Sequence, residues 1–237
     1  MSKIYAGGGD EADLDAETRI ILAVRRAISA GQVAAGTKLP EELLAEQFGT
    51  SRARIRIALQ HLAFENLVEQ KRNRGAFVAA PTAREAQDVF AARQVIERAT
   101  TEIVTRTITT RQVNMLKAII VEREREWSMG RRELAIDGIS MFHRSLAALA
   151  HNEALSIALE RLILRTSLIL GLYGTSRGLA SAPPRYWALI GAIELGDSAA
   201  AAKVMDQCLF DMEKELDIRD QAGKPEERLL RPDILIS

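Results

Sequence analysis

Cysteine, histidine and aromatic residues are scarce in this chain, and their scarcity limits what the protein can be. Its 237 residues include one cysteine, Cys208, so no intrachain disulfide can form. This usage is typical of a reducing compartment, and we expect a cytoplasmic protein. No apolar run reaches the roughly 18 residues needed to cross a bilayer. Residues 1–15 also lack the apolar segment of a secretion signal, so we expect no contact with a membrane.

An excess of charge of either sign is also lacking. The 32 lysines and arginines balance 32 aspartates and glutamates, which argues against a protein that coats nucleic acid without sequence preference. The positive charge is nevertheless concentrated between Thr50 and Gly75. The basic residues there are Arg52, Arg54, Arg56, Lys71, Arg72 and Arg74, and the acidic ones are Glu65 and Glu69.

Motifs of catalysis are missing as well. The sequence has no glycine-rich phosphate loop, no CxxC pair, no GxSxG elbow and no HExxH. Its histidines are His61, His143 and His151, and none forms a recognisable pair with a nucleophile. We therefore expect a protein that is not an enzyme.

The hydrophobic pattern predicts a small N-terminal domain over residues 16–80, after a disordered tail at 1–15. Apolar residues at helical spacing indicate a helix from Ala16 to Ser29, ended by Gly31. A second helix is predicted over Glu41 to Phe48. Ser51 has the character of an N-cap for a third helix that runs to about Glu65.

Two short apolar segments of strand type follow these helices. They are Leu67 to Gln70 and Ala76 to Ala79, and the polar turn Asn73-Arg74-Gly75 joins them as in a β-hairpin. Three helices and a two-stranded β-wing form a winged helix-turn-helix, which places one helix in the major groove of double-stranded DNA.

The third helix carries the residues expected to contact DNA. Arg52 and Arg56 lie four positions apart and share one helix face, where they suit contact with guanine or phosphate. Arg54 points elsewhere and is expected to contact phosphates. At the wing, Arg74 is predicted to reach a minor groove or the backbone, and Gly75 permits a turn with positive φ. The alternative is that these residues form only a solvated basic face.

From Thr82 to about Gln221 the pattern is helical, and it predicts an all-α bundle of about six helices. Pro81 marks the domain boundary, and residues 222–237 are expected to be irregular. Thr82 and Glu85 have the spacing of a capping box. Two interruptions are predicted: residues 100–110, where a helix frays into a threonine-rich loop, and a loop over residues 174–184.

The N-terminal half resembles the DNA-binding domain of GntR-type bacterial regulators. The resemblance covers about 65 residues and is carried by LPEELLAEQFGTSRARIRIALQHLAFENLVEQKRNRGAFVAAP. It implies that Arg52, Arg56 and the wing around Gly75 contact an operator. The chain departs from the family at three positions, Glu42, Arg54 and Ile57, so the resemblance leaves the operator sequence open.

The C-terminal half resembles the FCD type of all-helical ligand domain found in the FadR branch of that family. The segments AARQVIERAT, MFHRSLAALAHNEAL and ALIGAIELGDSAAAAKVM carry this resemblance. Many relatives bind a divalent metal through one aspartate and three histidines. Here only His143 remains, because Ile139, Tyr186 and Cys208 occupy the other three positions. We expect no metal. The alternatives are a metal held by His143 and Cys208 with outside help, or a His143 that is only a core residue.

The polar residues left in this pocket predict the kind of ligand. Arg93, His143, Tyr186 and Cys208 would suit a small carboxylate, since a guanidinium can pair with it in a bidentate way. The resemblance further implies a homodimer that binds a near-palindromic operator, most often as a repressor. In the alternative, the same DNA-binding protein uses its C-terminal bundle only to dimerise and senses no small molecule.

Overall fold

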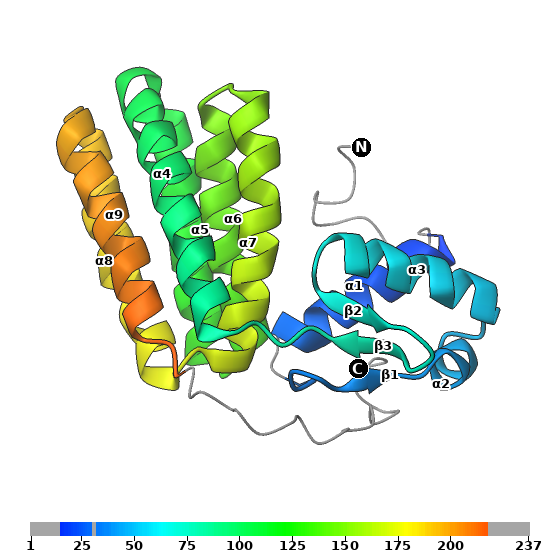
Figure 1. The fold of residues 1–237 in the computed structure, drawn as a ribbon. Coiled ribbons are helices and arrows are strands. Elements are labelled where there is room, and N and C mark those ends of the chain that lie inside the picture. Colours follow the sequence, from blue (N-terminus) through cyan, green and yellow to red (C-terminus); the bar gives the residue numbers. More distant parts are fainter. Residues whose placement is uncertain (1–14, 30–31, 218–237) are drawn as a thin grey trace.

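A computed structural model describes residues 15–29 and 32–217 of the chain (Figure 1). It shows a small N-terminal part of helices and a sheet beside a taller helical bundle, so the prediction of a mainly α protein is confirmed. The helix end expected at Gly31 and most of the two predicted tails, at 1–15 and 222–237, lie outside the described residues.

The N-terminal part has the winged-helix elements in the predicted order. Its helices are α1 (Ala16–Ser29), α2 (Glu41–Gln47) and α3 (Arg52–Phe64), and its strands are β1 (Lys38–Leu39), β2 (Val68–Lys71) and β3 (Gly75–Val78). The predicted hairpin is present as β2 and β3, and β1 pairs with β3 to complete a three-stranded antiparallel sheet of order β1-β3-β2, a third strand that was not predicted. A strand of two residues is too short to show an alternating pattern in the sequence.

The core of this part is made by the apolar faces of its helices. Ile20 and Val24 of α1 pack against Ile55 and Leu59 of α3, and all four are at most 1% exposed. The same cluster contains Leu168, which comes from the bundle helix α7 and is fully buried. The hydrophobic core of the winged helix therefore continues into the bundle.

The bundle consists, within the described residues, of six helices that stand side by side (Figure 1). They are α4 (Ala83–Thr107), α5 (Thr110–Ser128), α6 (Arg132–Leu149), α7 (Glu153–Tyr173), α8 (Ser176–Glu194) and α9 (Ser198–Lys214). Thr82 caps α4 by accepting a hydrogen bond from the Glu85 amide at 3.1 Å. No helix in the described ranges is both long and apolar enough to cross a membrane.

The threonine-rich segment is helical where a fraying loop was predicted. Helix α4 continues to Thr107, and α5 begins only three residues later, at Thr110. The hydroxyls of Thr100 and Thr105 bond the carbonyls four residues before them, at 2.8 and 2.7 Å. Burial of this face in the bundle outweighs the strand propensity of threonine, because a buried hydroxyl can be satisfied within its own helix.

The predicted loop at residues 174–184 is also wrong, since α8 begins at Ser176 and includes both prolines of that stretch. Thr175 caps the helix by accepting from the Gly178 amide at 3.0 Å. A proline at 183 cannot donate to the carbonyl of Leu179, four residues earlier. The guanidinium of Arg123 donates to that carbonyl instead, so a side chain of α5 replaces the missing helical hydrogen bond.

Arg165 of α7 connects the bundle to the end of α3. Its guanidinium donates to the Glu85 carboxylate, with Nε at 2.7 Å, and to the backbone carbonyl of Asn66. Asn66 has φ of 59° and ends the turn after α3. One helical turn earlier, Arg161 lies 4.9 Å from the ring of Phe64. Helix α7 thus touches the C-terminal end of α3 through both charge and packing.

We predict that Leu168→Ala lowers the free energy of unfolding by about 2–5 kcal/mol, the usual cost of removing a fully buried leucine side chain. Leu195→Ala serves as the control, because Leu195 is 85% exposed, and it should change stability by less than about 0.5 kcal/mol. Urea unfolding followed by circular dichroism measures both. Equal, small effects would show that α7 does not belong to the winged-helix core.

Candidate nucleic-acid interface and buried polar cluster

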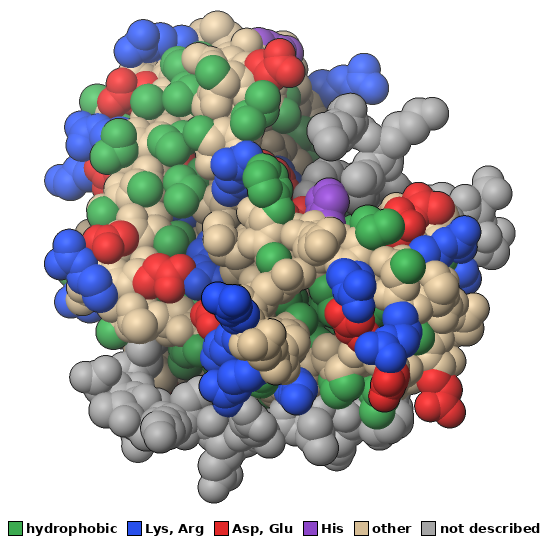
Figure 2. Space-filling view, turned by 45° about the vertical axis from the view of Figure 1, so that its right-hand side comes forward, with side chains coloured by type: hydrophobic (Ala, Val, Ile, Leu, Met, Phe, Trp, Pro, Cys, Tyr) green, Lys and Arg blue, Asp and Glu red, His purple; other side chains and the backbone are tan. Residues whose placement is uncertain are grey.

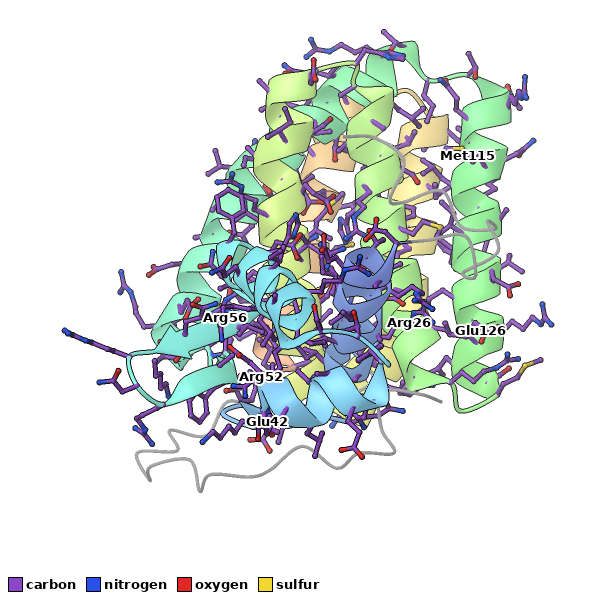
Figure 3. The ribbon with its side chains drawn as sticks, turned by 90° about the vertical axis from the view of Figure 1, so that its right-hand side faces the viewer. Arg26, Glu42, Arg52, Arg56, Met115 and Glu126 are labelled. Carbon is purple, nitrogen blue, oxygen red and sulfur yellow. The ribbon has the colours of Figure 1, made fainter. Side chains whose placement is uncertain are left out.

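The N-terminus of α3 places two arginines on the outer face of the winged helix. Ser51 accepts a hydrogen bond from the Arg54 amide at 3.4 Å, as predicted for an N-cap. Ile55 and Leu59 turn the opposite face of α3 into the core. The side chains of Arg52 and Arg56 are both 56% exposed and lie together on the side that faces the viewer in Figure 3.

Two glutamates of α2 hold these arginines. Glu41 accepts two hydrogen bonds from Arg56, from Nε to Oε1 at 3.0 Å and from Nη2 to Oε2 at 2.7 Å. Arg52 donates from Nη1 to Glu42 at 2.6 Å, and its Nη2 lies 3.8 Å from Glu41. The hydrogen bond from Arg56 lowers the pKa of Glu41 and raises that of Arg56. The spacing of the arginines is visible in the sequence, but their pairing with acidic residues of α2 is not.

Arg54 is exposed, and its position on α3 turns it away from the Arg52–Arg56 face. This separation is the one expected from the sequence. Its assignment to phosphate contact remains a prediction.

The wing carries positive charge around one buried ring. The cations of Lys38, Lys71 and Arg74 lie 5.9, 4.7 and 5.7 Å from the centre of the Phe77 ring. Gly75 has φ of 94°, so the predicted positive-φ turn is present. Asn73 also has positive φ, at 60°, and both it and Arg74 are exposed at the tip. Figure 2 shows basic and acidic side chains side by side on the winged-helix half.

Three of the four residues predicted for the effector site meet inside the bundle, around a carboxylate. Glu97 of α4 accepts from Nε of Arg93 at 2.6 Å and is bonded to Nδ1 of His143 in α6. On the other side of the imidazole, Nε2 lies 3.1 Å from the hydroxyl of Tyr186 in α8. None of the four side chains is more than about 3% exposed. We call Arg93, Glu97, His143 and Tyr186 the buried polar cluster.

Glu97 was not among the predicted site residues. In the sequence, Glu97 could have been found from its position four residues after Arg93, because this spacing allows an ion pair along one helix face. Burial alone would raise the pKa of Glu97, but Arg93 and His143 outweigh burial and lower this pKa to about 2. Glu97 is therefore an internal counter-ion for the side chains that were expected to bind a carboxylate.

Burial sets the protonation of the other cluster members. It lowers the pKa of His143, which is neutral at pH 7, and raises the pKa of the Tyr186 hydroxyl. A neutral imidazole that donates from Nδ1 to Glu97 has to accept at Nε2, so the Tyr186 hydroxyl donates there. Cys208 lies close enough to influence the pKa of Tyr186, and burial raises the pKa of its own thiol to about 12. At neutral pH the thiol stays protonated and packs as an apolar group.

These side chains do not fit a metal site. Both ring nitrogens of His143 already have partners, and Ile139 offers no donor atom. Cys208 would have to lose a proton that burial holds tightly. Within residues 15–29 and 32–217, no three side chains of histidine, cysteine, aspartate or glutamate form a group that could hold a metal ion.

A second buried arginine, which the sequence pattern did not predict, lies near the buried polar cluster. Arg123 of α5 is 2% exposed, and its charge acts on the Tyr186 hydroxyl. Its Nη2 donates to Leu179, but Nε and Nη1 are buried and have no hydrogen-bond partner among the described residues. The same holds for Nη2 of Arg93. The Tyr186 hydroxyl thus lies near the guanidinium groups of Arg93 and Arg123 as well as the carboxylate of Glu97.

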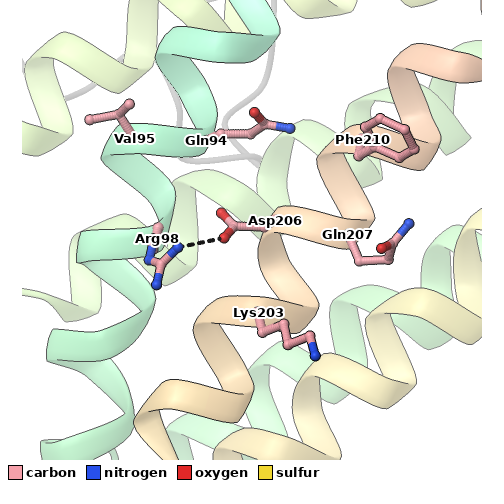
Figure 4. Close-up of a pocket in the computed structure, with 7 residues that line it drawn as sticks. All are labelled: Gln94, Val95, Arg98, Lys203, Asp206, Gln207 and Phe210. Atoms are coloured by element: carbon pink, nitrogen blue, oxygen red, sulfur yellow. Dashed lines mark hydrogen bonds and ion pairs between the residues drawn. The ribbon is translucent and has the colours of Figure 1, made fainter.

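Two hollows lie elsewhere in the bundle. A surface groove of about 400 Å³ between α4 and α9 is lined by Gln94, Val95, Arg98, Lys203, Asp206, Gln207 and Phe210 (Figure 4). Arg98 and Asp206 form an ion pair across it at 3.1 Å. A smaller hollow of about 10 Å³ lies beside Ile139, Leu179 and Arg185, and it has room for about one water molecule. Neither hollow is lined by a member of the buried polar cluster.

Comparison with known families agrees with this two-part architecture. The family described as "Bacterial regulatory proteins, gntR family" matches residues 16–78, and the family described as "FCD domain" matches residues 88–211. The FCD match spans more than half of the chain, so the chain belongs to the FCD-domain proteins, and its N-terminal domain is of the GntR type. Its C-terminal bundle is an FCD domain, and the resemblance inferred from the sequence is confirmed.

Individual relatives of this chain are named as regulators. It is 29% identical to the Uxu operon regulator of Haemophilus influenzae over 157 residues, which cover 61% of the chain and 58% of that protein. It is 42% identical to the galactonate operon transcriptional repressor of Escherichia coli over 67 residues, 28% of the chain and 29% of the repressor. Each match thus spans less than two thirds of the relative's length. Both relatives are named as regulators of operons.

Solved structures share the fold. A transcriptional regulator from Rhodococcus sp. RHA1 superimposes with a TM-score of 0.74 at 24% identity, over 84% of the chain and 95% of that structure. McbR/YncC of Escherichia coli does so with a TM-score of 0.72 at 18% identity, over 83% and 94%. At these identities the likeness extends to the arrangement of the helices and the wing.

We predict that Glu97→Gln lowers the free energy of unfolding at pH 7 by about 3–5 kcal/mol, because it leaves Arg93 as a buried cation without its anion. In the wild type, a depressed carboxyl pKa stabilises the fold fully above about pH 4.5, and this stabilisation is lost as the pH falls toward 2. The Glu97→Gln variant should not show this loss of stability as the pH falls, because it has no carboxyl group to protonate at that position. Urea unfolding at a series of pH values measures it.

Glu102→Gln is the matched control on the same helix, since the side chain of Glu102 is 35% exposed in its pairing with Arg98. It should leave both stability and acid dependence nearly unchanged. The double variant Arg93→Met/Glu97→Met should regain part of the lost stability. A Glu97→Gln protein as stable as the control would contradict the role of Glu97 as the counter-ion.

Proposed function

We propose that the protein is a homodimeric repressor that binds a near-palindromic operator and is released by a small carboxylic acid bound in its helical bundle. The observation that carries the DNA-binding part is the exposed Arg52–Arg56 pair at the N-terminus of α3. In a helix-turn-helix, that end of the second helix enters the major groove. Two guanidinium groups there suit the acceptor pattern of guanine.

The wing supplies the second contact in this proposal. Asn73, Arg74 and Gly75 form its tip, and positive φ at Asn73 and Gly75 makes the turn tight. A basic tip of this kind reaches the minor groove or the phosphates beside the recognition helix. Ser51 and Arg54 at the start of α3 contact the backbone and fix the position of the helix.

Two copies are needed to explain a palindromic operator. A twofold dimer presents two α3 helices about 34 Å apart, the spacing of one DNA turn. A ligand can release such a dimer only if it binds better to a conformation whose helix spacing does not fit the operator. In this proposal the protein acts in the cytoplasm, where both DNA and small metabolites are present.

The proposed effector is a small carboxylate, and it binds without a metal. Buried N–H groups of Arg93 and Arg123 lack acceptors among the described residues, and an anion beside them would supply such acceptors. Carboxylate oxygens are the acceptors that guanidinium groups pair with most strongly. The name of one relative, the galactonate operon repressor, refers to the salt of such an acid.

Arg165 offers a physical route from the bundle to DNA. Helix α7 contacts α6 through the Ser140 and Ser167 hydroxyls at 2.7 Å, and α6 carries His143. On its other side α7 holds Asn66, at the end of α3, through Arg165. A ligand that shifts α6 would move α7 and, with it, the recognition helix.

A second candidate function keeps the DNA binding and makes the bundle a dimerisation module that senses no small molecule. One observation favours it: Glu97 already occupies the acceptor position between Arg93 and His143. An external carboxylate would have to add to Arg123 or displace Glu97, which costs the stabilisation of a buried pair.

We expect Arg52→Ala and Arg56→Ala each to weaken binding to the operator by about 1–3 kcal/mol, because each removes a bidentate contact with a base. The operator is first obtained by selection from random double-stranded DNA, and affinities are measured by fluorescence anisotropy. Arg54→Ala is the control: as a phosphate contact, its loss should weaken binding to every sequence equally. If Arg52→Ala and Arg56→Ala behave like Arg54→Ala, the arginines do not read bases.

We expect a small carboxylic acid to raise the melting temperature, with about 2.7 kcal/mol of stabilisation at a hundredfold excess over its dissociation constant. A panel of acids, each paired with its uncharged amide, is screened by thermal shift with and without zinc, nickel and manganese. The acid should act alone, and the metals should add nothing and be absent by mass spectrometry. A panel without any active acid favours the dimerisation module, and a bound metal would overturn the metal-free site.

A further inference from the structure

The contacts between α2 and α3 assign a role to Glu41, which neither the motifs nor the family comparison identifies. We propose that Glu41 is a positioning residue that orients the guanidinium of Arg56 for reading DNA and so determines specificity. The inference rests on the proposed function, in which Arg56 contacts a base.

The geometry of the pair leaves one edge of Arg56 for DNA. Glu41 accepts from Nε and from Nη2, so it occupies the inner edge of the planar guanidinium. The N–H groups of Nη1 and the second N–H of Nη2 remain on the outer edge. That edge has the spacing of the two acceptors that guanine presents in the major groove. A guanidinium fixed along its inner edge therefore presents a complete donor pair to a base.

Fixing Arg56 changes specificity more than stability. Exposed ion pairs add little to the stability of a fold, and Arg56 is 56% exposed. A long arginine side chain, however, loses rotamer freedom when it makes a directed contact. Since Glu41 has already ordered the side chain in the free protein, less freedom is lost on binding the operator. A contact with any phosphate does not need that orientation and gains nothing from it.

The negative charge of Glu41 also favours specific over non-specific binding to DNA. The side chain of Glu41 is 25% exposed and lies next to both Arg52 and Arg56, on the face that meets the phosphates. Its negative charge weakens attraction to DNA of every sequence, because that attraction depends on neutralising phosphates. Glu41 therefore lowers non-specific affinity while it supports the specific contact.

Glu42 provides a matched comparison. It is the next residue on α2 and carries the same charge, but its side chain is 78% exposed and makes a single hydrogen bond, to Nη1 of Arg52. One hydrogen bond does not fix the plane of a guanidinium as two do. Neutralising Glu42 tests the loss of a charge near the phosphates, whereas neutralising Glu41 tests the loss of the charge and of the orientation of Arg56.

The experiment measures the affinity of the full-length protein for the selected operator, for operators changed at single positions, and for unrelated DNA. Glu41→Gln should reduce the ratio of operator to unrelated affinity roughly 3- to 10-fold, with the loss confined to the position that Arg56 reads. Glu42→Gln should raise both affinities alike and leave the ratio within about twofold. All variants are checked for an unchanged melting temperature.

Arg56→Ala separates failure of this inference from failure of the proposed function. If Arg56→Ala removes discrimination at one operator position and Glu41→Gln does not, Arg56 reads the base without help from Glu41, and the positioning role is overturned. If Arg56→Ala changes the affinity for all DNA equally, the base contact itself is absent. Identical effects of Glu41→Gln and Glu42→Gln would show that Glu41 acts only through its negative charge and does not orient Arg56.

Discussion

The buried carboxylate of Glu97 is the constraint on which the arrangement of the bundle depends. A carboxylate without water needs several partners, and these come from three helices: Arg93 from its own helix α4, His143 from α6 and, through the imidazole, Tyr186 from α8. These contacts join α4, α6 and α8 at one point inside the bundle. They also give each ring nitrogen of His143 a partner, so the histidine is part of a buried network.

In the rest of the molecule, arginine side chains form hydrogen bonds between different helices. Arg123 bonds the carbonyl that a proline leaves free in α8, and Arg165 joins the bundle to the end of α3. On the DNA-binding face, Arg56 is held by Glu41. Arg165 bonds a carboxylate and a backbone carbonyl at once, and Arg56 bonds one carboxylate through two nitrogens; the planar, forked guanidinium allows both arrangements.

Prediction from the sequence succeeded where local signals decide the structure. The bounds of α1, the cap at Ser51 and the positive φ at Gly75 depend on residues next to one another in the chain. It failed where distant residues decide. Strand β1 exists because β3 pairs with it, and in α8 the Leu179 carbonyl that a proline leaves free is bonded by Arg123 of another helix. The partners Glu41 and Glu97 were visible as residues, but their contacts required the fold.

By itself, the sequence determined the two-part organisation, the family and the arginines on one face of α3, because these follow from periodicity, capping and motif spacing. Only the tertiary structure decided which charges meet. It paired Arg56 with a glutamate 15 positions earlier and His143 with one 46 positions earlier. Such pairs form when helices pack, and the energy of an ion pair depends on distance and burial, which no linear pattern encodes.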